Sequence, residues 1–297
     1  MASGRKAVLR KARDTALATL NRMNLLLVDY PVRPRPRYGH GRPAHALLIS
    51  LLDERRGEYA ALLEQMLAWK ESLRAIPDTA DPSSGEPQWR DRFTGGLNGI
   101  ALYCFVAMRQ PKRFYEIGSG NSTKFAARAI RDSRLATEVL SIDPYPRSEV
   151  DRLCDRSIRT ALEESDLTIF EELTPGDILY VDNSHRAFQN SDVTVFFLDV
   201  VPRLAPGVLV GIDDIWLPLD YPPEWRFRYY SEQYLLACYL LAGGASIQPV
   251  LPGAFVSADT ELCKILCRSQ ALARIDPRGN AFWLETRTAE TDLVPRA

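Results

Sequence analysis

The sequence predicts an α/β fold in which a mostly parallel β-sheet carries helices on both faces. An apolar run at 113–117 leads into a glycine turn and then a helix. Beyond that helix, short apolar runs alternate with helix-like segments, which is typical of a parallel sheet covered on both sides. Several of these runs end on an Asp, and ligands of open α/β sheets bind beyond the carboxyl ends of the strands.

Length, charge and cysteine content narrow the class of protein. The chain has 297 residues and a formal net charge of −1, so nothing in its overall charge points to nucleic acid. It has no run of 18 apolar residues that would predict a membrane-spanning helix, and no secretory signal. Its five cysteines are odd in number and lie mostly in apolar runs. We therefore expect them to be reduced and mostly buried, as in a cytoplasmic protein.

Two parts are expected, an N-terminal helical region with a basic terminus over 1–94 and a core over 95–297. The first 37 residues carry nine Lys or Arg against two Asp. This basic segment could bind an acidic membrane surface or an acidic partner. The alternative is a solvated helix followed by a loose terminus. Apolar residues at three- and four-residue steps predict a helix over 44–75, divided at Gly57, and another over 97–108.

The glycine segment Glu-Ile-Gly-Ser-Gly-Asn-Ser-Thr has the composition of a nucleotide-binding turn. Gly118 and Gly120 let a ligand approach the backbone, and the Ser-Thr pair is expected to cap a helix starting near Lys124. A dinucleotide site would need a third glycine where Thr123 stands, and the charge of Glu116 would repel a pyrophosphate. S-adenosylmethionine (SAM) suits that carboxylate, because it brings a sulfonium and an ammonium and no phosphate. A glycine turn without a ligand is the alternative.

Carboxylates follow the predicted strands. The strand 139–142 ends on Asp143, which is suited to accept two hydrogen bonds from a ribose diol, unless it only initiates an Asp-Pro turn. The strand 177–181 is followed by Asp182 and His185. This is the titratable pair best placed for proton transfer, and the alternative for His185 is a helix cap or a satisfied core position.

The next predicted strand, 208–212, ends at Asp213 and Asp214. With Asp182 on the neighbouring strand, these carboxylates could hold a divalent cation through oxygen ligands. Alternatively, one of them orients His185 while the other is solvated.

A stiff aromatic loop over 216–225 follows, which we interpret as a substrate wall or lid. The remaining expected elements are a third strand within 157–162, a helix over 231–241, and strands over 247–251 and 282–284.

The order of these motifs resembles one bacterial branch of the class I SAM-dependent methyltransferases, over about residues 95–285. The motifs are Glu-x-Gly-x-Gly-Asn-Ser-Thr, Ser-Ile-Asp-Pro, Gly-Asp-Ile-Leu-Tyr-Val-Asp-Asn-Ser-His, Pro-Gly-Val-Leu-Val-Gly-Ile-Asp-Asp-Ile and Tyr-Pro-Pro-Glu-Trp. The resemblance implies a Rossmann-like, seven-stranded, mostly parallel sheet with a reversed last hairpin, and a one-carbon transfer to a small molecule. It departs at Asp213, where this branch often has a His.

The resemblance also implies a role for each matching residue. The expected cofactor-binding residues are Glu116, Gly118, Ser119, Gly120, Ser122, Asp143 and Asp182. The expected catalytic residues are Asp182, His185 and Asp214, with His185 as general base and Asp214 orienting it.

The function predicted from the sequence is SAM-dependent O-methylation of a small-molecule hydroxyl. A SAM-binding accessory protein without turnover is one rival. A nucleotide-dependent oxidoreductase is the other, and Thr123 and Glu116 disfavour it. The sequence leaves any metal ion and the oligomeric state open.

Overall fold

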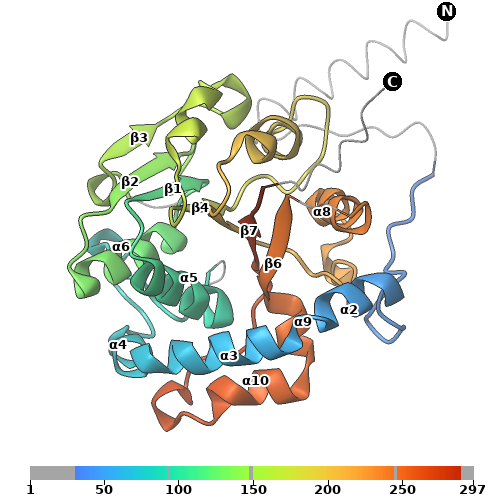
Figure 1. The fold of residues 1–297 in the computed structure, drawn as a ribbon, viewed down its shortest axis with the longest axis horizontal. Coiled ribbons are helices and arrows are strands. Elements are labelled where there is room, and N and C mark those ends of the chain that lie inside the picture. The colour runs from blue at the N-terminus through green and yellow to red at the C-terminus, as the bar shows by residue number, and fades with distance from the viewer. Residues whose placement is uncertain (1–30, 92–93, 147–149, 244–245, 289–297) are drawn as a thin grey trace, which may run out of the picture. The chain divides into compact units, whose positions relative to one another are not determined.

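The computed structural model describes residues 31–91, 94–146, 150–243 and 246–288 (Figure 1). The chain divides into two compact units, Met1–Arg35 and Pro36–Ala297. The second unit contains every helix and strand of the described residues. Most of the basic terminus lies outside the described residues, and the domain boundary expected after residue 94 stays a prediction.

A seven-stranded sheet lies at the centre of the second unit, in the order β3-β2-β1-β4-β5-β7-β6. Strands β1 to β5 pair in parallel, and β7 is antiparallel to both β5 and β6. The strands are β1 Arg113–Ile117, β2 Glu138–Ile142, β3 Arg156–Ile158, β4 Ile178–Val181, β5 Leu209–Ile212, β6 Ile247–Pro252 and β7 Phe282–Thr286. This order confirms the predicted Rossmann-like α/β class, including the reversed last hairpin.

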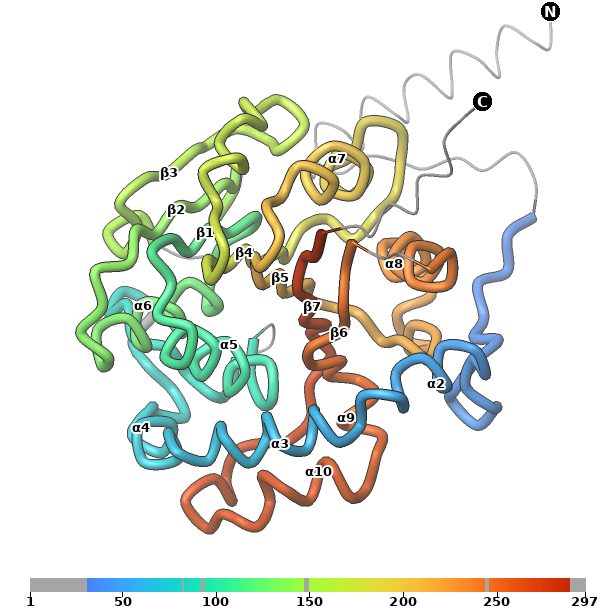
Figure 2. Tube along the Cα trace, viewed as in Figure 1, coloured from blue at the N-terminus to red at the C-terminus, as the bar shows by residue number. Residues whose placement is uncertain are grey.

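Helices surround the sheet (Figure 2). They are α2 Ala46–Asp53, α3 Arg56–Met66, α4 Lys70–Ala75, α5 Gly96–Arg109, α6 Asn121–Ser133, α7 Asp192–Val195, α8 Glu232–Leu241, α9 Gly253–Ala258 and α10 Thr260–Cys267. Every residue of β4 and β5 is buried, as expected of strands that are covered on both faces. The site therefore rests on a sheet whose middle strands are shielded from water.

The helices before β1 differ from the prediction. The expected long helix is broken at Glu54 and Arg55, and Gly57 lies inside α3. Tyr59 and Leu63 of α3 are fully buried in the same hydrophobic cluster as the strands, and α3 contacts α5, α10 and β6. Helices α9 and α10, between the last two strands, were not predicted.

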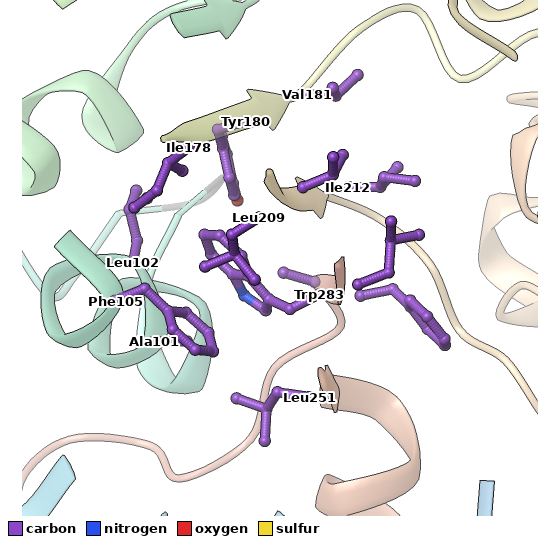
Figure 3. Packing of buried hydrophobic residues seen from close by; sticks show 14 of the residues in the cluster. Ala101, Leu102, Phe105, Ile178, Tyr180, Val181, Leu209, Ile212, Leu251 and Trp283 are labelled. Atoms are coloured by element: carbon purple, nitrogen blue, oxygen red, sulfur yellow. The ribbon is translucent and has the colours of Figure 1, made fainter. Parts of the chain in front are cut away.

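One packing arrangement links the core to the site. Trp283 of β7 lies against Phe105 of α5 and Tyr180 of β4, with ring centroids 4.5 and 5.5 Å apart (Figure 3). A methyl group on Gly211 of β5 would lie 2.8 Å from both Tyr180 and Trp283. Glycine at this position therefore leaves room for the two rings. Tyr180 is held so that its hydroxyl donates to Asp213 at the strand end (2.9 Å).

The cysteines are free thiols, but the expectation that they are mostly buried is wrong. Cys104 of α5 is buried, whereas Cys238 and Cys267 are exposed. The two exposed residues lie on α8 and at the end of α10, helices that turn one side to solvent. In the described residues, no helix is long and apolar enough to cross a membrane.

Candidate active site

The candidate site lies at the carboxyl ends of four adjacent parallel strands, β2, β1, β4 and β5. The expected functional residues follow these strands directly, so the parallel pairing brings them to one edge of the sheet. Two groups of residues meet there, a glycine loop after β1 and a charged cluster after β4 and β5.

The glycine loop passes very close to β4. Gly118 has a positive φ of 80°, and a Cβ at this position would overlap the backbone carbonyl of Asp182. Its N–H donates to the carbonyl of Ile142 on β2 (2.9 Å). Only glycine combines this φ with so close an approach, so Gly118 fixes the path of the loop between two strands.

Asp143 is joined to the same loop. The backbone N–H and the hydroxyl of Ser119 both donate to its Oδ2, at 2.9 and 3.0 Å. The N–H of Tyr145 donates to the other carboxylate oxygen (2.8 Å). The structure thus places the expected ribose-binding carboxylate against the expected cofactor loop.

Glu116 lies beneath the loop and is fully buried. The hydroxyl of Thr123 donates to its Oε2, whereas its Oε1 has no hydrogen-bond partner among the described residues. Burial raises the pKa of Glu116 to about 8, and the charges of Asp182 and Asp143 add to that increase. A cationic group bound nearby would satisfy the carboxylate, so this residue fits the ammonium of SAM.

The first turn of α6 corrects one prediction. The helix begins at Asn121 with Gly120 as its N-cap, so Ser122 and Thr123 lie inside the first turn and do not precede it. The hydroxyl of Thr123 accepts from the N–H of Gly120 (3.1 Å). Ser122 is buried in this turn, beside Glu116 and behind the loop.

The second group surrounds His185, which is 2% exposed. Its Nδ1 donates to Glu232 (2.8 Å). Its Nε2 lies 3.2 Å from Asp182 Oδ1 and 3.5 Å from Asp214 Oδ2. Both ring nitrogens therefore face carboxylates, and His185 has a left-handed backbone with φ of 59°.

Electrostatics in this cluster favour a charged imidazole. Burial alone would lower the pKa of His185, but hydrogen bonds to Asp182 and Glu232 and the charge of Asp214 raise it well above the usual range. Burial raises the pKa of Asp214, although the charges of His185 and Arg228 oppose this. These contacts therefore favour the protonated form of the His185 ring.

Asp213 is separate from this arrangement. It is 3% exposed and accepts from the amide of Asn98 (2.8 Å), the hydroxyl of Tyr180 and the N–H of Asp214. Burial, with the charges of Asp182 and Asp214, raises the pKa of Asp213 well above the usual range. Its hydrogen bond with Asn98 ties α5 to the end of β5.

The geometry gives no support to the divalent-cation hypothesis. Within the described residues, no three His, Cys, Asp or Glu side chains are grouped so that they could hold a metal ion. Asp182 and Asp214 instead face the Nε2 atom of His185.

The aromatic loop after β5 forms one wall beside His185. Tyr230 lies next to His185, with ring centroids 4.6 Å apart. Tyr221 stacks on Trp225 (6.3 Å) and meets Tyr230 edge-on (5.7 Å). The guanidinium of Arg228 lies 3.9 Å from the centre of the Trp225 ring. The contact with His185 comes from Tyr230, outside the span 216–225, and the role of that loop as a substrate wall or lid stays a prediction.

Sequence reasoning missed Glu232, whose carboxylate is the closest to His185. It lies in the helix predicted over 231–241, where an acidic residue in the first turn is ordinary and gives no functional signal. Asn183, which donates to the other oxygen of Glu232 (2.9 Å), was equally inconspicuous beside Asp182 and His185. These contacts depend on tertiary packing that local spacing does not reveal.

The sheet order, the reversed β7 and the glycine loop after β1 agree with the resemblance to the class I SAM-dependent methyltransferases. Residues 115–215 match a family model described as a methyltransferase domain. The match confirms the resemblance over these residues, which are similar to a methyltransferase domain.

Similar solved structures include three methyltransferases. The O-methyltransferase TomG from Streptomyces achromogenes, in complex with SAM, is 19% identical with a TM-score of 0.38, and the match covers 64% of this chain and 79% of that chain. An O-methyltransferase from Bacillus cereus, in complex with SAH, is 16% identical with a TM-score of 0.38, and the match covers 77% of this chain and 91% of that chain. SAH-bound PaMTH1 from Podospora anserina is 19% identical with a TM-score of 0.37, and the match covers 67% of this chain and 89% of that chain. A search of curated proteins finds no match.

Proposed function

We propose that this protein transfers the methyl group of SAM to a hydroxyl group of a small molecule. One observation carries the proposal: Asp182 belongs to both halves of the site. Its backbone carbonyl lies against Gly118 of the cofactor loop, and its carboxylate faces Nε2 of His185. A cofactor on the loop and an acceptor at the charged cluster would therefore be neighbours, as an in-line transfer requires.

The loop side is the proposed cofactor site. The residues that would hold SAM are Glu116, Gly118, Ser119, Gly120, Ser122, Asp143 and Asp182. The orphaned Oε1 of Glu116 suits a cationic group, and Asp143 offers two carboxylate oxygens to a ribose diol. Bound SAM supplies an electrophilic methyl group on a sulfonium.

The cluster of Asp182, His185 and Asp214 is the proposed catalytic group. The side chains of Asp182 and Asp214 are 15% and 21% exposed, whereas His185 is only 2% exposed. A hydroxyl acceptor therefore reaches the carboxylates first. As its oxygen gains a methyl group, its proton becomes strongly acidic, and a carboxylate is basic enough to take it.

This division of roles differs from the one predicted from the sequence. The prediction made His185 the general base and Asp214 its orienting partner. Here Glu232 orients the ring, and the Nε2 atom that would act as a base is already engaged by Asp182 and Asp214. We propose that a carboxylate accepts the proton while the imidazolium of His185 keeps both carboxylates ionised and close together.

The aromatic wall supports a flat acceptor. Tyr230 lies beside the ring of His185 and packs edge-on against Tyr221 and Trp225, and such aromatic clusters bind ring systems by stacking. The half-buried Arg228 adds a positive charge on the Trp225 face. A hydroxylated aromatic small molecule fits this environment.

Calorimetric titration of the purified protein with SAM, its demethylated product and NADH tests the proposal. We expect SAM and the product to bind, and NADH to bind more weakly or not at all, because Thr123 stands where a dinucleotide site needs a third glycine. Incubation with labelled SAM and a panel of hydroxylated aromatic compounds should then give a base-stable methyl ether. Tighter binding of NADH than of SAM would contradict the methyltransferase proposal. Transfer only to amines or carbon atoms would contradict the hydroxyl acceptor.

A further inference from the structure

Glu232 is the first residue of α8 and is fully buried. Its two carboxylate oxygens accept from different donors, Nδ1 of His185 (2.8 Å) and the amide of Asn183 (2.9 Å). The backbone N–H groups of Ser231 and Glu232 also donate to the carbonyl of His185, at 2.8 and 3.2 Å. The start of α8 therefore holds both the backbone and the ring of His185.

A fully buried carboxylate is costly unless charges and hydrogen bonds compensate for its lost hydration. The imidazolium of His185, the amide of Asn183 and the positive end of α8 supply that compensation for Glu232. A fixed Nδ1 contact also fixes where the opposite nitrogen points. Nε2 is thereby directed to the gap between Asp182 and Asp214.

We propose that Glu232 is a positioning residue of the methyl-transfer site, which holds His185 so that its Nε2–H is shared by Asp182 and Asp214. The inference rests on the proposed function, in which those two carboxylates meet the acceptor. Glu232 itself is fully buried and contacts the ring of His185 through Nδ1, on the side opposite to Nε2. Its effect passes through the position and charge of His185.

The groups that face His185 come from several segments of the chain, so the pKa of the ring depends on all of them. Asp182 and Asn183 precede it in the chain, Asp214 follows β5, and the ring of Tyr230 covers one side. Two further charges act at longer range, Asp192 on Glu232 and Arg228 on Asp214.

The test is a pH titration of the imidazole nitrogens by long-range ¹H–¹⁵N NMR on the full chain without ligand. The chain has three histidines, so the His40 and His45 signals serve as internal references. We expect His185 to keep both ring protons through neutral pH in the unaltered protein. In Glu232→Gln, loss of the neighbouring negative charge should lower the midpoint of the His185 titration by about 1–3 pH units.

Two further variants make the result decisive. Asn183→Ala removes the hydrogen bond from Asn183 to the Glu232 carboxylate and should shift the His185 midpoint in the same direction by a smaller amount. This variant still tests the proposal if Glu232→Gln does not fold. Glu224→Gln, at an exposed position of the aromatic loop, is the matched control and should leave the midpoint unchanged. An unshifted His185 in Glu232→Gln, or a singly protonated ring at neutral pH in the unaltered protein, would overturn the proposal.

SAM titration of the same preparations separates this inference from the proposed function. Normal SAM binding with an unshifted His185 overturns the role of Glu232 alone. A shifted His185 in a protein that does not bind SAM supports the positioning by Glu232 and overturns the methyltransferase proposal.

Discussion

The two halves of the site differ in how their residues are brought together. Ser119 and Asp143, which link the glycine loop to β2, are 24 residues apart. His185 and Glu232 are 47 residues apart, and both are buried. The loop half thus joins the ends of the paired strands β1, β2 and β4, whereas the charged half also needs α8 packed against β4 and β5. We infer that mutations of buried residues in either half mainly change stability, and that mutation of the partly exposed Asp143 of the loop half mainly changes ligand binding.

The charges sharpen this contrast. In the charged half, Asp182, Asp214 and Glu232 surround the single ring of His185, which is the partner that all three carboxylates share. In the loop half, Asp143 is compensated by backbone and hydroxyl donors that water or a ligand could replace. The loop half can therefore exchange partners without loss of the fold.

His185→Ala should have the largest effect and tests the charged half directly. Without the ring, Glu232 is a fully buried carboxylate that has lost its charged partner, and Asp182 and Asp214 lose theirs as well. Removal of one partner from a buried ion pair costs about 3–5 kcal/mol. Urea denaturation at pH 7 should show this loss in the free energy of unfolding. His45→Ala is the matched control, because His45 caps α2 by accepting from the N–H of Leu48 and should cost only about 1 kcal/mol. Equal losses would mean that His185 is an ordinary capping residue.

The fold and the loop half could be predicted because their signals are local. The apolar runs that became β1, β2, β4 and β5 end within a residue or so of the predicted limits, and each is bounded by Gly, Asp or Pro. Gly118 and Asp143 were recognisable because each follows a strand directly. Local composition was enough wherever a residue's role depends on its immediate neighbours.

The charged half could be predicted only in part, since spacing does not report on tertiary contacts. Asp182 and His185 were identified because they follow β4. Glu232 and Asn183 were not, because a helix-start carboxylate and a turn amide have many ordinary uses. Asp213 and Asp214 are adjacent in the chain but face different surroundings, which no spacing rule distinguishes. The exposed Cys238 and Cys267 were misjudged because apolar neighbours do not show which side of a helix is covered.

Glu116→Gln is the second prediction, and it separates stability from binding by pH. The pKa of Glu116 is raised to about 8, so the folded protein keeps this proton where the unfolded chain has lost it. The free energy of unfolding therefore falls as pH rises from about 4.5 to 8, at roughly 1.4 kcal/mol per pH unit from this group. The Gln variant lacks that fall. Between pH 5 and pH 8 we therefore expect the free energy of unfolding of the Gln variant to increase by on the order of 2–4 kcal/mol relative to that of the unaltered protein.

The pH dependence of SAM affinity should have the opposite sign to the pH dependence of stability, and Glu116→Gln should remove it. Higher pH ionises Glu116 and strengthens its attraction for the ammonium of SAM, so the affinity of the unaltered protein should rise between pH 6 and pH 7.5. That rise should be absent in Glu116→Gln and present in Glu164→Gln, whose side chain is exposed. Denaturation and calorimetry at matched pH values give both quantities. A Gln variant with the same pH dependence as the unaltered protein would contradict a buried, proton-holding Glu116.

Asp143→Ala is the smallest of the three effects and tests whether the loop half serves binding. Loss of hydrogen bonds to a carboxylate should weaken SAM and its demethylated product alike by about 1.5–3 kcal/mol, or roughly 10- to 150-fold. The loss of stability without ligand should be smaller than that of His185→Ala, because the N–H groups of Ser119 and Tyr145 can turn to water at the open edge of the sheet. Asp166→Asn, an exposed carboxylate that accepts only from Thr168, should leave affinity unchanged. Unaltered SAM affinity in Asp143→Ala would remove this residue from the ribose site, and a stability loss equal to that of His185→Ala would remove the distinction between the two halves.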